Sequence, residues 1–179
     1  MKVLRTGMLC ALILGLSAWP ALSSASPIPE FTHGTATEWI NSAPLSLARL
    51  RGKVVLLEFW TFDCINCLRT LAWVKDVHSR LAGSDFVVIG VHTPELPEER
   101  PADNVRAAVR RLGVNYPVML DADSSYWNAI GNRYWPAFYL IDRDGSLSSQ
   151  TIGEVHAGDS TAVRMEASIR NLLAVSPQH

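Results

Sequence analysis

The chain has 179 residues and a mass of 19.7 kDa, which suffices for one ordinary domain but not for two full-sized ones. Hydrophobic residues make up 48% and charged residues 18% of the chain, so general disorder is excluded. The net charge is −1, and no basic block is present that could neutralise a run of phosphates, which argues against nucleic-acid binding. Three cysteines are too few for a disulfide-stapled scaffold or for a four-thiolate zinc site.

The N-terminal residues 1–25 are expected to be a secretory signal peptide. Basic residues precede an apolar run over 8–19, and small residues at 23–25 supply a cleavage site. The apolar run is short for a membrane span of about 20 residues, so an uncleaved anchor is the alternative. We therefore expect the protein in the periplasm or another extracytoplasmic space, where thiol pairs oxidise readily. Cleavage would also remove Cys10.

Residues 26–44 are expected to be an N-terminal leader, and residues 45–179 the folded domain. Prolines and a glycine in 26–34 predict a solvated stretch, and 35–41 is predicted as a short helix.

From residue 45 the apolar pattern predicts alternating strands and helices. An edge strand and turn are expected over 45–53, and a surface loop over 93–101, where prolines and acidic residues gather. The remaining strands are predicted over 53–60, 86–91, 117–120, 137–142 and 147–152, and the helices over 64–81, 103–112 (capped by Asp103), 123–130 and 161–175.

Two features of this pattern predict the architecture. The run over 53–60 is almost continuously apolar, as in a strand buried on both faces. Asp144-Gly145 between the last two strands is a hairpin signal. Strands that first alternate with helices and then pair as a hairpin predict an α/β fold, with a mixed sheet covered by helices on both faces.

The two cysteines outside the signal segment stand three apart, in Cys64-Ile65-Asn66-Cys67, where a buried strand turns into a helix. Positions i and i+3 share one helix face, so the two sulfurs can form a bond. Backbone amides and the helix dipole favour a thiolate at the helix N-terminus. We therefore expect Cys64 to be the exposed nucleophile of disulfide exchange and Cys67 to resolve the mixed disulfide.

Other uses of the pair remain open at this point. A static disulfide over so short a loop would stabilise the fold poorly. Zinc would find only half of its tetrahedral shell, because His78 and His92 lack a paired spacing, and copper lacks a clear third ligand. We expect no bound metal, with the redox-active disulfide as the only redox group.

The segment from Glu58 to Cys67, directly after an apolar strand, resembles thioredoxin-fold proteins of the TlpA/ResA type. It is most similar to the thioredoxin-like domain of DipZ-type proteins, within the redoxin superfamily. The resemblance continues, in order, over residues 87–95, 103–106, 131–137 and 140–145. It implies a thioredoxin fold with a segment inserted after the second core strand.

The resemblance also implies a thiol–disulfide oxidoreductase that acts outside the cytoplasm. Its substrates would be protein thiols and disulfides, and a membrane or periplasmic redox partner would recycle the cysteine pair. The family tips the expected direction towards reduction. Membrane association is expected only if the N-terminal segment is uncleaved, and no nucleic-acid partner is expected.

Further site residues follow from the resemblance. Pro136 matches the family's cis-proline, which lies beside the cysteines and presents backbone to a substrate. Trp135 would then help to shape the docking surface together with Ile65 and Asn66, although ordinary packing is an equal alternative for Trp135.

Glu58 matches the acid beneath the thioredoxin disulfide, which makes it the expected general base for Cys67. The alternative is a strand residue that faces solvent.

The sequence departs from thioredoxins at two positions. Asp63 stands directly before the first cysteine, where thioredoxins often have tryptophan, and its charge opposes thiolate formation. Asn66 replaces the proline found in many thioredoxins.

Two rival functions remain. Thr61-x-x-Cys64 fits part of a peroxiredoxin motif, although Leu57 stands where that motif has proline, so a thiol peroxidase is the enzymatic rival. A copper- or metal-handling protein that merely uses the fold is the other, because fold alone does not define function.

Overall fold

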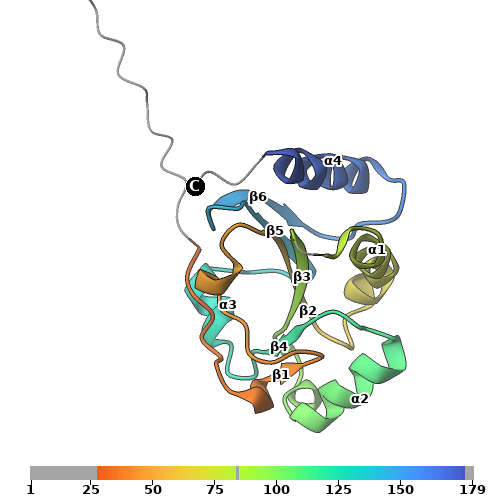
Figure 1. Ribbon diagram of the computed structural model, residues 1–179. Coiled ribbons are helices and arrows are strands. Elements are labelled where there is room, and N and C mark those ends of the chain that lie inside the picture. Colours follow the sequence, from red (N-terminus) through yellow and green to blue (C-terminus); the bar gives the residue numbers. More distant parts are fainter. Residues whose placement is uncertain (1–27, 84, 176–179) are drawn as a thin grey trace, which may run out of the picture.

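The computed structural model describes residues 28–83 and 85–175, so the expected signal peptide lies outside the described residues. The described chain forms a six-stranded sheet in the order β1-β4-β3-β2-β5-β6 (Figure 1). The strands are β1 (Trp39–Ile40), β2 (Val54–Trp60), β3 (Phe86–His92), β4 (Val118–Leu120), β5 (Ala137–Ile141) and β6 (Leu147–Ile152). The helices are α1 (Ile65–Leu81), α2 (Ala102–Leu112), α3 (Ser125–Ile130) and α4 (Ser160–Ala174), with 3-10 helices η1 (Ala36–Glu38), η2 (Ala48–Leu50) and η3 (Pro97–Glu99).

The sheet is mixed, as predicted. β2, β3 and β4 run parallel to one another. β1 pairs antiparallel with β4, β5 with β2, and β6 with β5. All seven residues of β2 are buried, in keeping with its apolar run. At the β5–β6 hairpin, Gly145 has a φ of 72°, a conformation that glycine adopts without strain.

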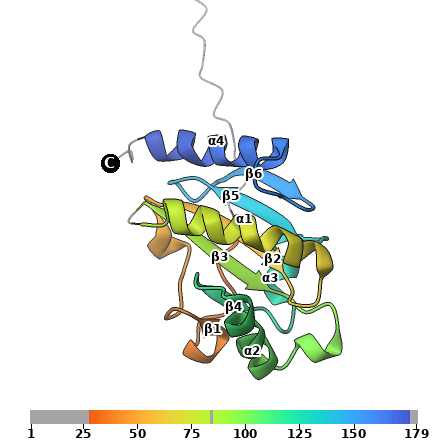
Figure 2. The ribbon, with the colours of Figure 1, turned by 90° about the vertical axis from the view of Figure 1, so that its right-hand side faces the viewer.

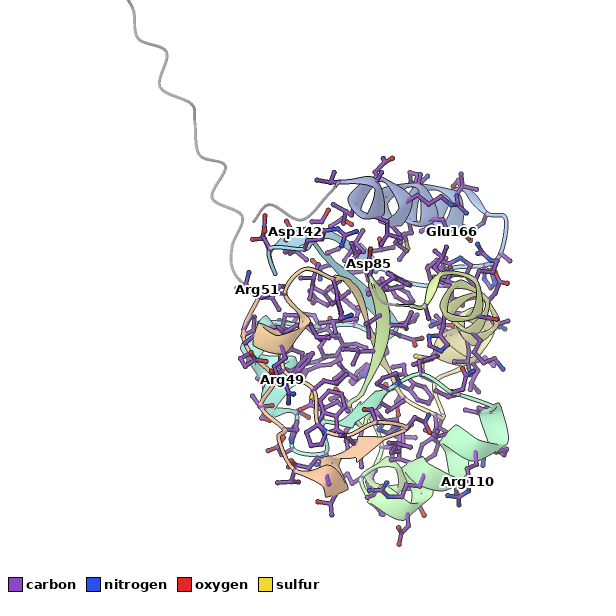
Figure 3. The ribbon with its side chains drawn as sticks, in the orientation of Figure 1. Arg49, Arg51, Asp85, Arg110, Asp142 and Glu166 are labelled. Atoms are coloured by element: carbon purple, nitrogen blue, oxygen red, sulfur yellow. The ribbon has the colours of Figure 1, made fainter. Side chains whose placement is uncertain are left out.

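Helices cover both faces of the sheet, which confirms the thioredoxin-like architecture. On one face, α1, α2 and α4 pack on the even-numbered residues of β2 in a shared apolar core. On the other face, α3 and residues around η2 pack on the odd-numbered ones. Figure 2 shows α1 lying across the sheet with α4 beside it. Charged side chains such as Arg110 and Glu166 lie at the periphery, around an interior filled with side chains (Figure 3).

The N-terminal segment is part of the folded domain. Trp39 is only 2% exposed and pairs with Met119 across β1 and β4. Phe31 makes edge-to-face contacts with Trp39 and Tyr126. The expected solvated stretch over 26–34 is therefore wrong for its described part, since apolar burial against the sheet overrides its loop-like composition.

Three local predictions were also wrong. The edge strand expected within 45–53 is the 3-10 helix η2, and the helix expected over 35–41 is η1 followed by β1. In both places tertiary pairing and packing override a weak local preference. Helix α2 begins after Pro101, and Asp103 lies in its first turn, where its negative charge suits the helix dipole, rather than at the cap. No helix in 28–83 or 85–175 is long and apolar enough to span a membrane.

Candidate active site

The two cysteines lie where the chain passes from the end of β2 to the start of α1. Cys64 is the N-cap of α1, with extended backbone (φ −79°, ψ 113°), and its Sγ accepts from the backbone N–H of Cys67 at 3.4 Å. Cys64 is partly exposed, whereas Cys67 is 1% exposed, and both thiols are free. Burial, together with the adjacent Cys64 sulfur and the Glu58 carboxylate, raises the pKa of the Cys67 thiol strongly. The structure thus brings together one accessible sulfur and one buried sulfur whose ionisation is strongly disfavoured.

Glu58 lies in the middle of β2 on the face covered by α1, and it is 0% exposed. This burial excludes the solvent-facing alternative. Tyr116 donates its phenolic hydrogen to Glu58 Oε2 at 2.8 Å, while Oε1 has no hydrogen-bond partner among the described residues. Burial raises the pKa of Glu58 to about 7, against the opposing effect of the Tyr116 hydrogen bond. The carboxyl group can therefore gain or lose a proton near neutral pH.

A glycine opposite Glu58 makes room for this arrangement. Gly90 of β3 pairs with Glu58 across the parallel strands. A Cβ at Gly90 would lie 2.8 Å from Trp60 Nε1 and 3.2 Å from Tyr116 Cε2. Any larger residue would therefore push the indole or the phenol out of place. Tyr116 was not predicted from the sequence, and no local pattern connects it to Glu58.

Pro136 has a cis peptide bond with Trp135 and stands directly before β5. Because Ala137 pairs with Phe59 of β2, this bend lies next to the end of the strand that leads to Cys64. The Trp135 indole donates to the carbonyl of Thr93 at 3.1 Å, and its ring packs on Trp127 with centroids 4.1 Å apart. Trp135 is half-buried and so combines packing with a place on the rim of the site.

The rim around Cys64 is apolar and exposed. Ile65 directly follows Cys64 and is 57% exposed, and Tyr134, two residues before the cis-proline, is 56% exposed. Asn66 is also exposed. Two exposed apolar side chains thus lie on the segments that carry Cys64 and the cis-proline.

The loop between β3 and α2 contains a buried acid that sequence reasoning missed. Glu99 was expected in a surface loop, but its carboxylate is buried and accepts a hydrogen bond from the Thr61 hydroxyl. His92 is buried beside Thr61, with Nε2 3.3 Å from the hydroxyl oxygen. Burial lowers the pKa of His92 to about 4, so this ring is neutral at physiological pH. In the sequence Glu99 stands among other acidic residues and prolines that are typical of a surface loop, so nothing distinguished it as a buried residue.

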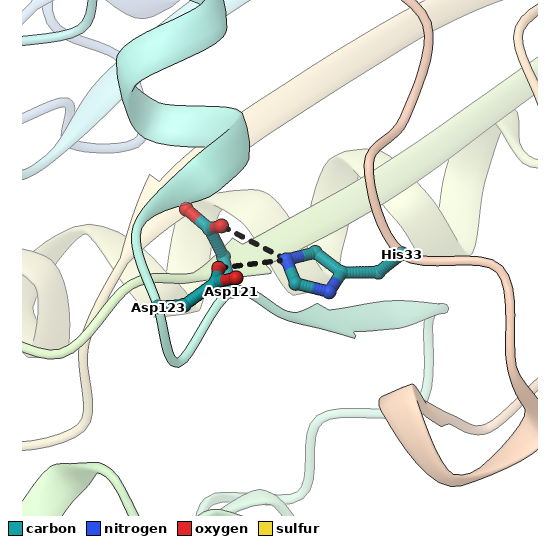
Figure 4. Close-up of side chains that lie close together, drawn as sticks. All are labelled: His33, Asp121 and Asp123. Atoms are coloured by element: carbon teal, nitrogen blue, oxygen red, sulfur yellow. Dashed lines mark hydrogen bonds and ion pairs between the residues drawn. The ribbon is translucent and has the colours of Figure 1, made fainter.

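A second cluster lies at the N-terminal segment, where His33 faces Asp121 and Asp123 (Figure 4). His33 Nε2 lies 3.0 Å from Asp121 Oδ1 and 3.4 Å from Asp123 Oδ1. Burial lowers the pKa of His33, but the bonds to Asp121 and Glu38 outweigh it and raise the value overall. Hydrogen bonds from the His33 ring to Asp121 and Glu38 account for the cluster.

Asp121 is already well supplied with donors. It accepts from the backbone N–H groups of Tyr126 and Trp127 and from the Thr93 hydroxyl, at 2.8 to 3.0 Å. These bonds cap α3 and hold the end of β3, so the cluster has a structural explanation without a metal ion.

Comparison with known proteins places this arrangement in a family. The profile of the Redoxin family matches residues 23–169. The chain is 41% identical to protein DipZ of Mycobacterium tuberculosis (strain CDC 1551 / Oshkosh) over 140 residues, covering 76% of this chain and 19% of that protein. It is 24% identical to thiol-disulfide oxidoreductase YkuV of Bacillus subtilis (strain 168), covering 83% of this chain and 95% of that protein.

Among solved structures, a thioredoxin-like superfamily protein designated SPOA0173 matches with a TM-score of 0.73 and 25% identity, covering 85% of this chain and 99% of that one. The first curated relatives are much longer proteins, of which this chain spans only 13% to 19%.

The fold and the cysteine pair define the class as a thioredoxin-fold protein with a Cys-x-x-Cys pair at the start of helix α1. The chain belongs to the redoxin family, and the predicted TlpA/ResA-type resemblance is confirmed.

Proposed function

We propose that the protein reduces disulfide bonds of other proteins by dithiol exchange through Cys64 and Cys67. One observation carries this proposal. An accessible sulfur caps helix α1, and a buried second sulfur stands one turn along, on the face that covers Glu58. Disulfide exchange needs both an exposed attacking thiolate and a resolving thiol within reach.

In the first step the Cys64 thiolate attacks one sulfur of the substrate disulfide. A bond forms between the two sulfurs, the substrate disulfide breaks, and its other sulfur leaves as a thiolate that takes a proton. In the second step Cys67 attacks Cys64 Sγ, and the second substrate sulfur leaves as a thiol. Two electrons and two protons pass from the dithiol to the substrate, and the Cys64–Cys67 disulfide remains.

Glu58 is the proposed base of the second step. The buried Cys67 thiol does not ionise by itself near neutral pH, since burial raises its pKa strongly. A buried carboxylate whose pKa is about 7 can accept the Cys67 proton at physiological pH.

The rim formed by Ile65, Asn66, Tyr134 and Trp135 is the proposed docking surface for the substrate. Two of these side chains are more than half exposed and apolar, which suits a protein segment rather than a small polar molecule. The proposed location is extracytoplasmic, following the signal-like N-terminal sequence. A membrane or periplasmic dithiol protein would return electrons to the Cys64–Cys67 disulfide.

The rival functions have less support. In a thiol peroxidase the Thr61 hydroxyl would orient peroxide, but this hydroxyl is buried and donates to Glu99. For a metal carrier, the one cluster of His, Cys, Asp and Glu with metal-ligand spacing among the described residues is at His33 and does not include the cysteines.

The test combines an activity and a potential. The reduced full chain should reduce a model protein disulfide, Cys64→Ser should be inactive, and Cys67→Ser should accumulate the mixed disulfide. A reduction potential of about −270 mV for the Cys64–Cys67 couple fits a reductant, whereas one of about −120 mV would overturn the proposed direction of electron transfer. Fast, Cys64-dependent peroxide consumption without any disulfide substrate would instead favour the peroxidase.

A further inference from the structure

Glu99 is a buried carboxylate that the dithiol mechanism does not use. It stands in η3, just after β3, and is 1% exposed. The other buried acids among the described residues are Glu58, bonded to Tyr116, and Asp121, paired with His33. None of the ion pairs between described residues involves Glu99. A charge is costly to bury without a counterion, so hydrogen bonds must hold this one in place.

Four donors from two loops meet this carboxylate. Oε1 accepts from the Thr61 hydroxyl and from the backbone N–H of Asp63 at 3.0 Å. Oε2 accepts from the backbone N–H groups of Glu95 and Leu96, at 2.7 and 2.8 Å. One oxygen therefore holds the loop that leads into α1, and the other holds the loop that follows β3. These bonds favour the ionised form and lower the pKa of Glu99 against the opposing effect of its burial.

We propose that Glu99 is a positioning residue for the nucleophile Cys64, an inference that rests on the proposed function of the cysteine pair. Asp63, whose N–H Glu99 binds, directly precedes Cys64. The Cys64 sulfur must accept from the N–H of Cys67 to cap α1, and this depends on how the preceding loop enters the helix. Fixing that entry fixes the distance over which Cys67 attacks.

The loop after β3 also contacts Trp135, so positioning by Glu99 extends to the proposed docking surface. The carbonyl of Thr93, at the start of that loop, accepts a hydrogen bond from the Trp135 indole. Glu99 therefore connects the nucleophile loop, through the β3 loop, to the segment that precedes the cis-proline. A substrate that docks across Cys64 and Trp135 would therefore contact two segments whose relative position is fixed by these hydrogen bonds.

A positioning role of Glu99 and an effect of its charge alone predict different results when Glu99 is substituted. Its negative charge opposes the formation of a thiolate nearby, so loss of the charge alone shifts the pH dependence of the reaction to lower pH. Loss of position instead slows closure of the disulfide at every pH, because intramolecular attack requires close alignment. The pH-independent plateau of the closure rate therefore separates the two roles.

The experiment follows the full reduced chain in its reaction with a small aromatic disulfide, which any accessible thiolate attacks. The first burst of released aromatic thiol reports attack by Cys64, and the second reports closure by Cys67. Rates are measured against pH for the wild type, Glu99→Gln and Glu99→Asp, which keeps the charge but withdraws the carboxylate by one methylene. Glu98→Gln is the control, because Glu98 is an exposed neighbour in the same short helix.

We expect the closure plateau to fall roughly tenfold or more in both Glu99 variants and to stay unchanged in the control. A shift of the pH midpoint with an unchanged plateau would overturn the proposal in favour of a charge effect. A lower melting temperature with wild-type closure at 20 °C or so would overturn it in favour of general stability. If Glu99→Gln does not fold, Glu99→Asp decides. Failure to reduce protein disulfides would refute the proposed function separately, since this assay uses no protein substrate.

Discussion

The phenol of Tyr116 offers a direct test of Glu58 as the proposed base. Tyr116→Phe removes one oxygen and leaves the ring that packs beside Gly90 in place. Glu58 then loses the only hydrogen bond that it makes through its side chain among the described residues. That bond favours the ionised carboxylate, so its loss raises the pKa of Glu58 above about 7.

The size of the shift follows from the strength of the bond. A hydrogen bond to a charged group contributes about 1.5 to 3 kcal/mol, and one pKa unit corresponds to about 1.4 kcal/mol. The pH midpoint of closure by Cys67 should therefore move up by about 1 to 2 units. At neutral pH, where the wild type is near its midpoint, closure should slow by about 5-fold to 50-fold.

The assay is the second phase of the reaction with an aromatic disulfide, measured over a range of pH. Tyr126→Phe is the matched control, because Tyr126 is also fully buried but lies in the opposite core, and its hydroxyl has no hydrogen-bond partner among the described residues. That variant should keep the wild-type midpoint. An unchanged midpoint in Tyr116→Phe would show that the phenol does not control the base.

Other changes test the buried polar groups. In Glu58→Gln the free energy of unfolding should no longer fall as the pH rises. The raised pKa of Glu58 means that the folded chain holds this proton more tightly than the unfolded chain does. The resulting stabilisation of the wild type is complete below about pH 4.5 and is lost as the pH rises through about 7. The difference reaches roughly 3 kcal/mol above that range, and denaturant titrations at pH 5 and pH 8 or so would reveal it; parallel losses in both proteins would contradict the burial argument. Arg143→Ala should cost about 2 to 4 kcal/mol, because Arg143 donates to the carbonyls of Gly52 and Leu173 at 2.6 and 3.0 Å, and a stability within 0.5 kcal/mol or so of wild type would refute this. Gly90→Ala should cost about 1 to 3 kcal/mol and disturb closure, since its Cβ would meet Trp60; thermal unfolding and closure rates identical to wild type would mean that the pocket has spare room.

Much of the fold could be predicted because its signals are local. The apolar run of β2, the helical spacing after Cys64 and the Asp144-Gly145 turn each lie within one element, and each has the predicted structure. The cysteine pair was visible for the same reason, since its two members are three residues apart.

The remaining parts of the site depend on contacts between distant segments. Tyr116 lies 58 positions from Glu58, and Glu99 lies 38 positions from Thr61, so no periodicity connects either pair. The two-residue strand β1 exists because Trp39 finds Met119 across the sheet, which the surrounding composition does not indicate. Sequence reasoning therefore found the two cysteines but missed Tyr116, which bonds Glu58, and Glu99, which holds the loop before Cys64.

The short strand β1 also has a consequence for how copies of the protein meet. By pairing with β4 it occupies one border of the sheet and leaves β6 as the other. Residues 148–150 of β6 are exposed and polar, and no further strand lies beyond β6 among the described residues. A border strand presents backbone N–H and C=O groups that can pair with a strand of another molecule, so contact between copies is expected at β6 rather than at the two-residue strand β1.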